Sequence, residues 1–431
     1  MKKLVVAVLL ATLTISCREK HEIDIVIEPR RGDILSADGK VLATSIGFLE
    51  EAYSIYLTGE CGIRTFKRLK SGELVPARKK RWIEPKDGSD VVTTIDIAVQ
   101  MITDSCLRRR LQYHNADHGT AVVMEVSTGD IKAIANLGRD EFGHYKELYN
   151  YALGESKEPG STFMLMTYMA MMEDGKLQLT DSIDNGTTGA VYYQGKRVHD
   201  DNRSITTGWI TVEKAFAHSS NISVTKFADK HYRGKEKQFI DRIYGMNLNQ
   251  KLGLYGEGDP DIKYPGNRYW TELTLTQMAY GYDVRLAPIH VLTFYNAVAN
   301  DGKMVNPEFV KELTRQGATE KTFEVQVIKP QIASAGTISK AKKMLEAVVE
   351  YGTAQNIKTD IYKIAGKTGT VQFDNGNGPK CDASFVGYFP SEQPKYSIYV
   401  SIYDPTVNGY SGGSVAAPVF REIADEIFNQ Q

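Results

Sequence analysis

The sequence predicts an α+β domain in which helices pack against a mainly antiparallel sheet. Three observations support this class: a hairpin pattern around residue 129, a long helical region over about 161–355, and a return to strand patterns after residue 383 that ends in an amphipathic helix. Strands grouped before and after one block of helices do not alternate as parallel βαβ units do. An antiparallel sheet layered with helices is therefore favoured.

The individual elements are predicted from periodicity and from cap or turn signals. Thr94 or Asp96 is available as a cap for the helix that opens near residue 95. Pro288 suits the start of a helix, and Gly175 suits the left-handed residue that ends one. The predicted strands are 21–27, 121–126, 131–135, 383–389 and 395–403, and the predicted helices are the one from 95 onward, 161–173, 289–299, 338–349 and 418–428.

Length and composition limit the classes of function. The chain has 431 residues, of which 42% are hydrophobic, and this allows a large core and two or three domains. A formal net charge of −1 gives no support for a nucleic-acid partner. The basic run at 78–81 is interpreted as a solvated face or a linker.

The first 17 residues have the pattern of an export signal. Lys2 and Lys3 precede an apolar run at 4–15, which is shorter than the roughly 20 residues that a membrane span needs. Ser16-Cys17 resembles a bacterial lipoprotein cleavage site, with Cys17 as the lipidated residue. The alternatives are an uncleaved membrane anchor and a coincidental apolar start. A lipoprotein signal and an uncleaved anchor both place the rest of the chain in the cell envelope, periplasmic and attached to a membrane.

Cysteine and histidine spacings predict no metal site and no disulfide framework. Cys61, Cys106 and Cys381 stand far apart in the sequence, and they are expected to be unpaired or partly buried thiols. His114 and His118 lack the carboxylate of a zinc-protease pattern, so a surface loop ahead of a strand is expected there.

Three short motifs follow one another along the chain. They are Ser161-Thr162-Phe163-Met164 at a predicted helix start, Ser219-Ser220-Asn221 after an apolar run, and Lys367-Thr368-Gly369-Thr370 before the C-terminal strands. Each alone is a weak signal, because such short patterns occur by chance in many proteins. Their order, with long intervals between them, is much more specific.

The first motif suits nucleophilic catalysis by a serine. Ser161 at a helix N-terminus lies in the positive end of the helix dipole, where free backbone N–H groups can stabilise an oxyanion. The fourth residue of the motif shares a helical face with the serine. A lysine at that position can take the serine proton if its pKa is lowered, whereas the thioether of Met164 cannot.

The other two motifs suit proton relay and substrate binding. Ser219 can relay a proton, and the amide of Asn221 can orient a substrate. Lys367 brings a positive charge for a carboxylate, and Gly369 lets the strand backbone approach a ligand closely. The three motifs together predict an acylation site beside a carboxylate-binding site.

With these motifs the chain resembles the class B penicillin-binding proteins, which are peptidoglycan D,D-transpeptidases, and among them it is most similar to the division-type members. Further segments that carry the resemblance are 31–39, 94–100, 120–135, 300–303, 384–390 and 415–420. The resemblance implies a penicillin-binding-protein/β-lactamase-like transpeptidase domain over 91–431. It also implies a small β-rich remnant of the family's pedestal over 18–90, because the stretch between Ala43 and Thr94 is much shorter than in the family.

The resemblance also implies a role for each motif residue. Ser161 is the nucleophile that attacks a D-Ala-D-Ala carbonyl, and no metal or cofactor takes part. The catalytic set is Ser161, Ser219, Asn221 and Lys367, the substrate-binding set is Lys367, Thr368 and Gly369, and the oxyanion hole is formed by the N–H groups of Ser161 and Thr370. The implied ligands are peptidoglycan stem peptides and β-lactams, and cell-wall synthesis or division proteins are candidate partners.

Met164 is the main departure from the family pattern, since it stands where the general base belongs. Loss of a general base typically costs about 10²–10⁴ in rate. Lys367, acting through Ser219, is the one evident substitute, and that role would divert it from the carboxylate. Met164 as a plain core residue, Ser161 as a simple helix cap and 367–369 as an ordinary strand edge are the structural alternatives.

Two hypotheses about function remain. The first is a serine D,D-transpeptidase or related acyl-transferase with weak or rerouted activity, which the retained serines, asparagine and lysine favour. The second is a catalytically inactive pseudo-transpeptidase that binds peptidoglycan or cell-wall partners, which Met164 and the short pedestal favour. A hydrolase of penicillins ranks third, because no deacylating glutamate motif is evident.

Overall fold

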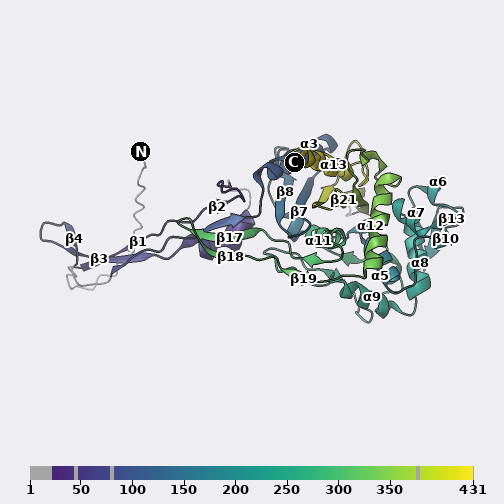
Figure 1. The fold of residues 1–431 in the computed structure, drawn as a ribbon, viewed down its shortest axis with the longest axis horizontal. Helices are drawn as coiled ribbons and strands as arrows, with labels where there is room; N and C mark the ends of the chain where they lie inside the picture. The colour runs from purple at the N-terminus through teal and green to yellow at the C-terminus, as the bar shows by residue number, and fades with distance from the viewer. Residues whose placement is uncertain (1–21, 43–46, 78–81, 375–378, 431) are drawn as a thin grey trace.

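The computed structural model describes residues 22–42, 47–77, 82–374 and 379–430. The molecule is elongated, with a narrow arm of strands at one end and a large body of sheet and helices at the other (Figure 1). The body has the predicted α+β composition, so the fold class is confirmed.

One six-stranded antiparallel sheet forms the centre of the body. Its order is β20-β21-β22-β7-β8-β9. The strands are β20 (Ala365–Asp374), β21 (Pro379–Phe389), β22 (Tyr396–Tyr403), β7 (His118–Glu125), β8 (Ile131–Arg139) and β9 (Tyr145–Lys146). The predicted hairpin is β7 and β8, and the predicted C-terminal strands lie beside it because β22 pairs with β7.

Helices cover both faces of this sheet. α3 (Ile97–His114) and α13 (Ala416–Asn429) contact each other on one face, and α11 (Pro288–Ala299) lies against the other (Figure 1). α3 begins where Asp96 accepts hydrogen bonds from the backbone N–H groups of Ala98 and Val99, as a capping carboxylate does. Every residue of α11 is buried, which explains its almost wholly apolar sequence.

A second group of helices packs beside the free edge of the sheet, where β20 lies. Its members are α5 (Met164–Glu173), α7 (Val212–Ala217), α8 (Asn221–Tyr232), α9 (Glu236–Gly245) and α12 (Ala335–Glu350). α12 contacts α5, α7 and β20. α5 is buried from Met164 to Met172, and flexible methionine side chains suit such an enclosed helix.

Shorter elements connect these parts. They are α4 (Tyr151–Gly154), η1 (Gly160–Phe163), β10 (Ser182–Asp184), β11 (Ala190–Tyr193), β12 (Lys196–His199), α6 (Arg203–Thr206), β13 (Trp209–Thr211), β14 (Asp261–Ile262), α10 (Thr274–Met278), β15 (Val284–Arg285), β16 (Met304–Val305), β19 (Val327–Lys329) and η2 (Gln355–Ile357).

The N-terminal region is β-rich, as predicted, and shares a sheet with a later part of the chain. The arm consists of β1 (Glu22–Ile27), β3 (Gly62–Arg68), β4 (Leu74–Pro76) and β5 (Trp82–Ile83). Between arm and body lie α1 (Gly47–Ala52), α2 (Ser54–Thr58) and a sheet of order β18-β17-β6-β2, formed by β18 (Ala318–Thr322), β17 (Val310–Arg315), β6 (Asp90–Thr93) and β2 (Ile34–Leu35). The predicted boundary at 90/91 therefore falls inside β6, and the domain limits stay a prediction.

Several predictions concern residues outside the described ranges. The signal or anchor at 1–17, including Cys17, and the basic run at 78–81 are among them. Within the described residues, no helix combines the length and the apolar character needed to cross a membrane.

The two histidines differ from the prediction. His114 is the last residue of α3 and His118 the first of β7, and both are buried, so a surface loop was the wrong expectation. The thiols of Cys106 and Cys381 are buried and that of Cys61 is exposed, and the structure leaves all three unpaired within its described ranges.

Candidate active site

Ser161 lies in η1, a single 3-10 turn that leads into α5. The preceding Gly160 has φ +55, and a Cβ there would come within 2.6 Å of Val371 Cγ2 on β20. Only glycine tolerates both the left-handed backbone and this close approach, so η1 can lie directly against the edge strand. Ser161 is half-buried, and its hydroxyl forms no hydrogen bond with any described residue.

The second motif joins α7 to α8. Ser219 has φ +56, an uncommon conformation for a residue other than glycine. Its Oγ lies 2.8 Å from Nζ of Lys367 and 3.9 Å from Sδ of Met164. Ser219 is thus the residue at which all three predicted motifs come together.

Lys367 is buried in β20 with 0% of its surface exposed. Besides the contact with Ser219, its amine donates to the carbonyl of Thr368 at 3.0 Å. Among the described residues no carboxylate lies within ion-pair distance of it. Burial without a counter-charge lowers the pKa of Lys367 to about 7, so a large fraction of this amine is neutral near neutral pH.

Met164 is the first residue of α5, and its side chain is fully buried. Its sulfur contacts the Ser219 hydroxyl at the edge of the site, so the residue belongs to the core and also lines the motif cluster. A thioether is a weak hydrogen-bond acceptor and cannot hold a proton. No proton acceptor therefore stands at this position.

Asn221 opens α8, and its side chain points toward the end of β12. Its Nδ2 donates to the carbonyl of His199 at 3.1 Å, while its buried Oδ1 has no donor within the described ranges. A polar atom left without a partner is unfavourable and marks a position that a ligand or a nearby donor can satisfy.

The buried carboxylate of Asp200 supports the second motif, although no sequence pattern marks this residue. It accepts hydrogen bonds from Ser220 Oγ at 2.6 Å and from the backbone N–H of Ile222 at 3.0 Å. Burial raises the pKa of Asp200 above its ordinary value. Because both donors flank Asn221, this carboxylate fixes the first turn of α8.

The third motif lies on β20, the edge strand of the central sheet. An edge strand keeps alternate backbone groups free, and such N–H groups are available for an oxyanion. A Cβ on Gly369 would come within 2.4 Å of Ser384 Oγ and 3.0 Å of Thr162 Cγ2. Around it, Thr370 Oγ1 accepts from the N–H of Gly412 at 3.0 Å, and Thr368 Oγ1 lies 2.7 Å from Thr353 Oγ1.

The structure therefore brings most of the predicted site residues to one place. Ser161 and Met164 come from η1 and α5, Ser219 from the α7–α8 turn, and Lys367 from β20, while Gly369 and Thr370 lie where β20 contacts η1. The arrangement of a helix-end serine, a buried amine and an open strand edge is suited to serine acyl transfer.

Comparison with known proteins defines the class. Residues 119–425 match the model of the penicillin binding protein transpeptidase domain, and the chain belongs to this family. Its curated relatives include a protein named as a probable peptidoglycan D,D-transpeptidase.

Two relatives illustrate the extent of the match. The chain is 26% identical over 386 residues to "Probable peptidoglycan D,D-transpeptidase PenA" of Neisseria flavescens, covering 86% of this chain and 91% of that protein. It is 30% identical over 388 residues to stage V sporulation protein D of Bacillus subtilis, covering 87% of this chain but 59% of that protein. The chain thus spans well under two thirds of the Bacillus relative.

A solved structure agrees with the fold. Penicillin binding protein 3 from Mycobacterium tuberculosis, complexed with aztreonam, superposes with a TM-score of 0.78 at 23% sequence identity. The match covers 94% of this chain and 97% of that chain, so the similarity of fold extends over nearly the whole molecule.

Proposed function

We propose that the chain is a cell-envelope serine acyl-transferase acting on D-Ala-D-Ala stem peptides of peptidoglycan, in which Lys367 serves as the proton acceptor through Ser219. The observation that carries this proposal is the 2.8 Å contact between the buried Lys367 amine and the Ser219 hydroxyl, in the absence of a described carboxylate partner. The names of the relatives, which include a D,D-transpeptidase, support the substrate class.

The proposed proton path begins at the nucleophile. Ser161 Oγ attacks the carbonyl of the penultimate D-Ala, and its proton passes by way of Ser219 to the neutral amine of Lys367. The oxyanion is stabilised by the N–H groups of Ser161 and Thr370. When the C–N bond breaks, Lys367 returns the proton to the departing D-Ala amine, and a second amine attacks the acyl group by the reverse path.

Binding of a carboxylate and acceptance of a proton need not compete at Lys367. In the free protein the amine lacks a counter-charge, which is why burial lowers its pKa. A substrate carboxylate placed near it raises that pKa again, because an opposite charge favours the ammonium form. The amine then becomes a stronger proton acceptor when the substrate arrives, and the resulting ammonium pairs with the carboxylate.

The direct test is intact-mass spectrometry after incubation with a fluorescent penicillin. The proposal requires a covalent adduct in the wild-type chain that disappears in Ser161→Ala and forms far more slowly in Lys367→Met. Absence of any adduct at high concentration and long times would refute acyl transfer. An adduct of equal rate in Lys367→Met would assign the proton to another group.

A pseudo-transpeptidase remains the second candidate. It is favoured by the buried thioether of Met164 and by a Ser161 hydroxyl without any described hydrogen-bond partner. On this alternative the chain binds penicillin or a stem-peptide analogue reversibly and forms no adduct. Equilibrium dialysis with a radiolabelled penicillin, combined with the mass measurement, separates the two candidates.

We further propose that the chain is periplasmic and attached to a membrane through its N-terminus, as a lipoprotein through Cys17 or by an uncleaved anchor. The sequence pattern at 1–17 supports this, and cell-wall or division proteins are its proposed partners. Metabolic labelling with a clickable fatty acid tests the lipid, and Cys17→Ser should abolish incorporation if Cys17 carries it.

A further inference from the structure

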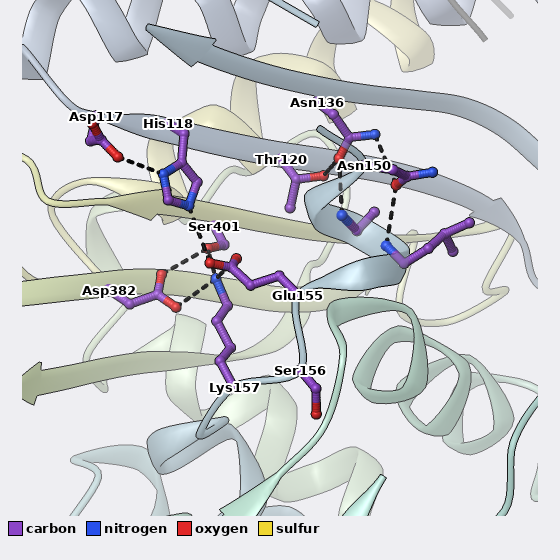
Figure 2. A network of polar contacts seen from close by, with 12 residues as sticks. Asp117, His118, Thr120, Asn136, Asn150, Glu155, Ser156, Lys157, Asp382 and Ser401 are labelled. Carbon is purple, nitrogen blue, oxygen red and sulfur yellow. Dashed lines mark hydrogen bonds and ion pairs between the residues drawn. The ribbon is translucent and has the colours of Figure 1, made fainter. Parts of the chain in front are cut away.

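A cluster of charged side chains surrounds Lys157, and none of its members belongs to the three motifs (Figure 2). At its centre is the ammonium of Lys157, whose Nζ lies 2.7 Å from Asp382 Oδ2, 2.9 Å from Glu155 Oε2 and 2.9 Å from Ser401 Oγ. An ammonium has three N–H donors, and here each has its own acceptor. We call Lys157, Glu155, Asp382 and Ser401 the Lys157 cluster.

The cluster is enclosed and rigidly built. The side chains of Lys157 and Asp382 are 15% and 7% exposed. Ser401 Oγ also donates to Asp382 Oδ1 at 2.7 Å, and Glu155 Oε1 lies 3.3 Å from Nε2 of His118. The His118 ring is stacked with both Tyr151 and Tyr403, which holds this outer partner in place (Figure 2 labels the histidine).

The cluster joins the two segments that carry the oxyanion donors. Lys157 lies four residues before Ser161 in the segment that enters η1, and its backbone forms an isolated β-bridge with Leu286. Asp382 lies on β21 directly opposite Val371, the neighbour of Thr370 on β20. Val371 Cγ2 in turn occupies the space next to Gly160. Lys157 and Asp382 therefore connect the segment that enters η1, which carries Ser161, to the part of β21 that pairs with β20 next to Thr370.

The Lys157 amine stays charged, so it is not a substitute for the missing base. Burial opposes its charge, but Asp382 and Glu155 outweigh this and hold the pKa of Lys157 well above its ordinary value. Burial likewise opposes the charge of Glu155, yet Lys157 and His118 lower the pKa of that carboxyl to about 2. A group that stays protonated throughout the working range cannot accept the serine proton.

Stability alone does not explain such a cluster. Desolvation of buried charges cancels much of their attraction, and replacement by apolar side chains of similar size is often neutral or stabilising. The best-attested use of a buried polar interaction is to fix a register. Here the register concerned is that between η1 and β20.

We propose that Lys157 is a positioning residue whose contacts with Asp382, Glu155 and Ser401 set the spacing between the Ser161 and Thr370 N–H groups and so adjust the oxyanion hole. The inference rests on the proposed acyl transfer. It concerns the transition state rather than binding, because the cluster is made of residues outside all three motifs.

The test compares two variants, Lys157→Met and the double variant Lys157→Met/Asp382→Leu. The double variant is needed because Lys157→Met alone leaves the buried carboxylate of Asp382 without its ammonium partner, which can destabilise the fold. Lys132→Met is the matched control, since Lys132 also pairs with two carboxylates, Glu125 and Asp130, at 3.0 Å each, but on the β7–β8 hairpin. Stopped-flow acylation by a fluorescent penicillin separates the binding constant from the limiting acylation rate. Thermal unfolding is recorded for each chain.

We expect both Lys157 variants to lose about 10–10³ in limiting acylation rate, at most the loss of about 10²–10³ that follows complete removal of an oxyanion donor, with the binding constant changed by less than about threefold. The double variant should regain thermal stability without regaining rate, and Lys132→Met should acylate like the wild type. A double variant with the wild-type limiting rate would overturn the proposal, as would an equal loss in Lys132→Met.

A crystallographic measurement keeps the inference testable if the wild-type chain forms no adduct at all. The separation of the Ser161 and Thr370 nitrogen atoms should increase in the double variant and stay the same in Lys132→Met. An unchanged separation in the double variant contradicts the positioning role, whereas a missing wild-type adduct contradicts only the proposed function.

Discussion

Lys367 is the residue on which the chemistry of the site depends, because its amine is buried without a described counter-charge. In most settings a lysine is an ammonium at neutral pH, but here burial lowers the pKa of Lys367 to about 7. Two predictions follow from this pKa, one for rate and one for stability.

The rate of acylation should depend on pH with a midpoint near 7. Proton acceptance needs the neutral amine, which is present above the pKa of Lys367 and is lost as the pH falls below it. The second-order rate constant of acylation at low penicillin concentration, which reports the free chain, should therefore rise from pH 5 to pH 8 and level off above. A rate that is flat across this range would exclude Lys367 as the acceptor.

The free energy of unfolding should depend on pH through the same group. The pKa of Lys367 is about 7 in the folded chain and near its ordinary value of 10.5 in the unfolded chain, so between these values the unfolded chain binds more protons. Stability then increases with pH across this window, by up to about 1.4 kcal/mol per pH unit for one group. Urea titrations of wild type and Lys367→Met from pH 6.5 to 9.5 should diverge accordingly, with the wild type relatively weaker at the acid end. Parallel curves would mean that the lysine titrates normally.

Met164→Lys should increase the acylation rate by about 10²–10⁴, the usual contribution of a general base. The new amine would lie next to Ser219, and the unpartnered Oδ1 of Asn221 offers an acceptor in the same motif. Met164→Leu, which keeps the apolar volume, is the control and should leave the rate near that of the wild type. An unchanged rate in Met164→Lys would show that an existing acceptor already suffices.

At the scale of single residues, the sequence predicted the members of each motif. It did not predict the contacts between residues that are far apart in the chain. Ser161, Ser219 and Lys367 are recognisable because their neighbours in sequence are characteristic. Lys157 was not predicted, because its ion-pair partner Asp382 and its hydrogen-bond partner Ser401, 244 residues away, lie on distant strands without a characteristic sequence around them. A buried ion pair between distant elements leaves no local pattern.

The contact between η1 and β20 is the element-scale feature that shapes the site. Gly160→Ala should be costly, because φ +55 disfavours a side chain and the new Cβ would come within 2.6 Å of Val371 Cγ2. We expect a loss of about 2–4 kcal/mol in unfolding free energy, together with slower acylation, since η1 must move away from β20.

Gly175→Ala is the matched control for this change. Gly175 has φ +68 at the end of α5, but a Cβ there would meet no atom within 4 Å. Gly175→Ala should lose only the unfolding free energy that a side chain costs in a left-handed backbone conformation, about 1–2 kcal/mol. It should acylate at the normal rate. Equal losses in both variants, measured by urea unfolding, would mean that the packing against Val371 contributes nothing.

Elements with strong periodicity were predicted closely, and irregular ones were not. The predicted helix 289–299 is α11, and the predicted strands 383–389 and 395–403 are β21 and β22. The predicted helix at 161 begins instead with the 3-10 turn η1, because Gly160 must first bring the chain against β20. The short strands β10 to β13 were also missed, since two-stranded pairs of three or four residues carry little periodicity.

At the scale of the whole molecule, the sheet β18-β17-β6-β2 connects the N-terminal region with a segment more than 200 residues later. Such a pairing could not be predicted, because sequence patterns identify strands but not their neighbours. It does explain why β6 carries buried valines at positions 91 and 92, which pack across from β17.

Two truncated chains test this connection. A chain that begins at Ser89 retains β6 and its pairing with β17. A chain that begins at Thr94 lacks β6, so this edge of β17 is unpaired. Loss of two buried valines costs about 3–6 kcal/mol. We therefore expect the shorter chain to melt roughly 10 °C lower, with a greater tendency to aggregate through the open strand edge. Equal melting temperatures in differential scanning calorimetry would mean that the pairing of β6 with β17 adds no stability to the body.

The arm also lies between the proposed attachment point at the N-terminus and the candidate active site, and so separates the two. β1 begins at Glu22, close behind the proposed attachment point at Cys17, and its six residues alone span about 20 Å. Figure 1 places β1 at the opposite end of the molecule from α5 and α8, which border the site. A chain tethered at its N-terminus would thus hold Ser161 at a distance from the lipid surface, so the stem peptides proposed as its substrates would be those within the wall rather than those of precursors still on the bilayer.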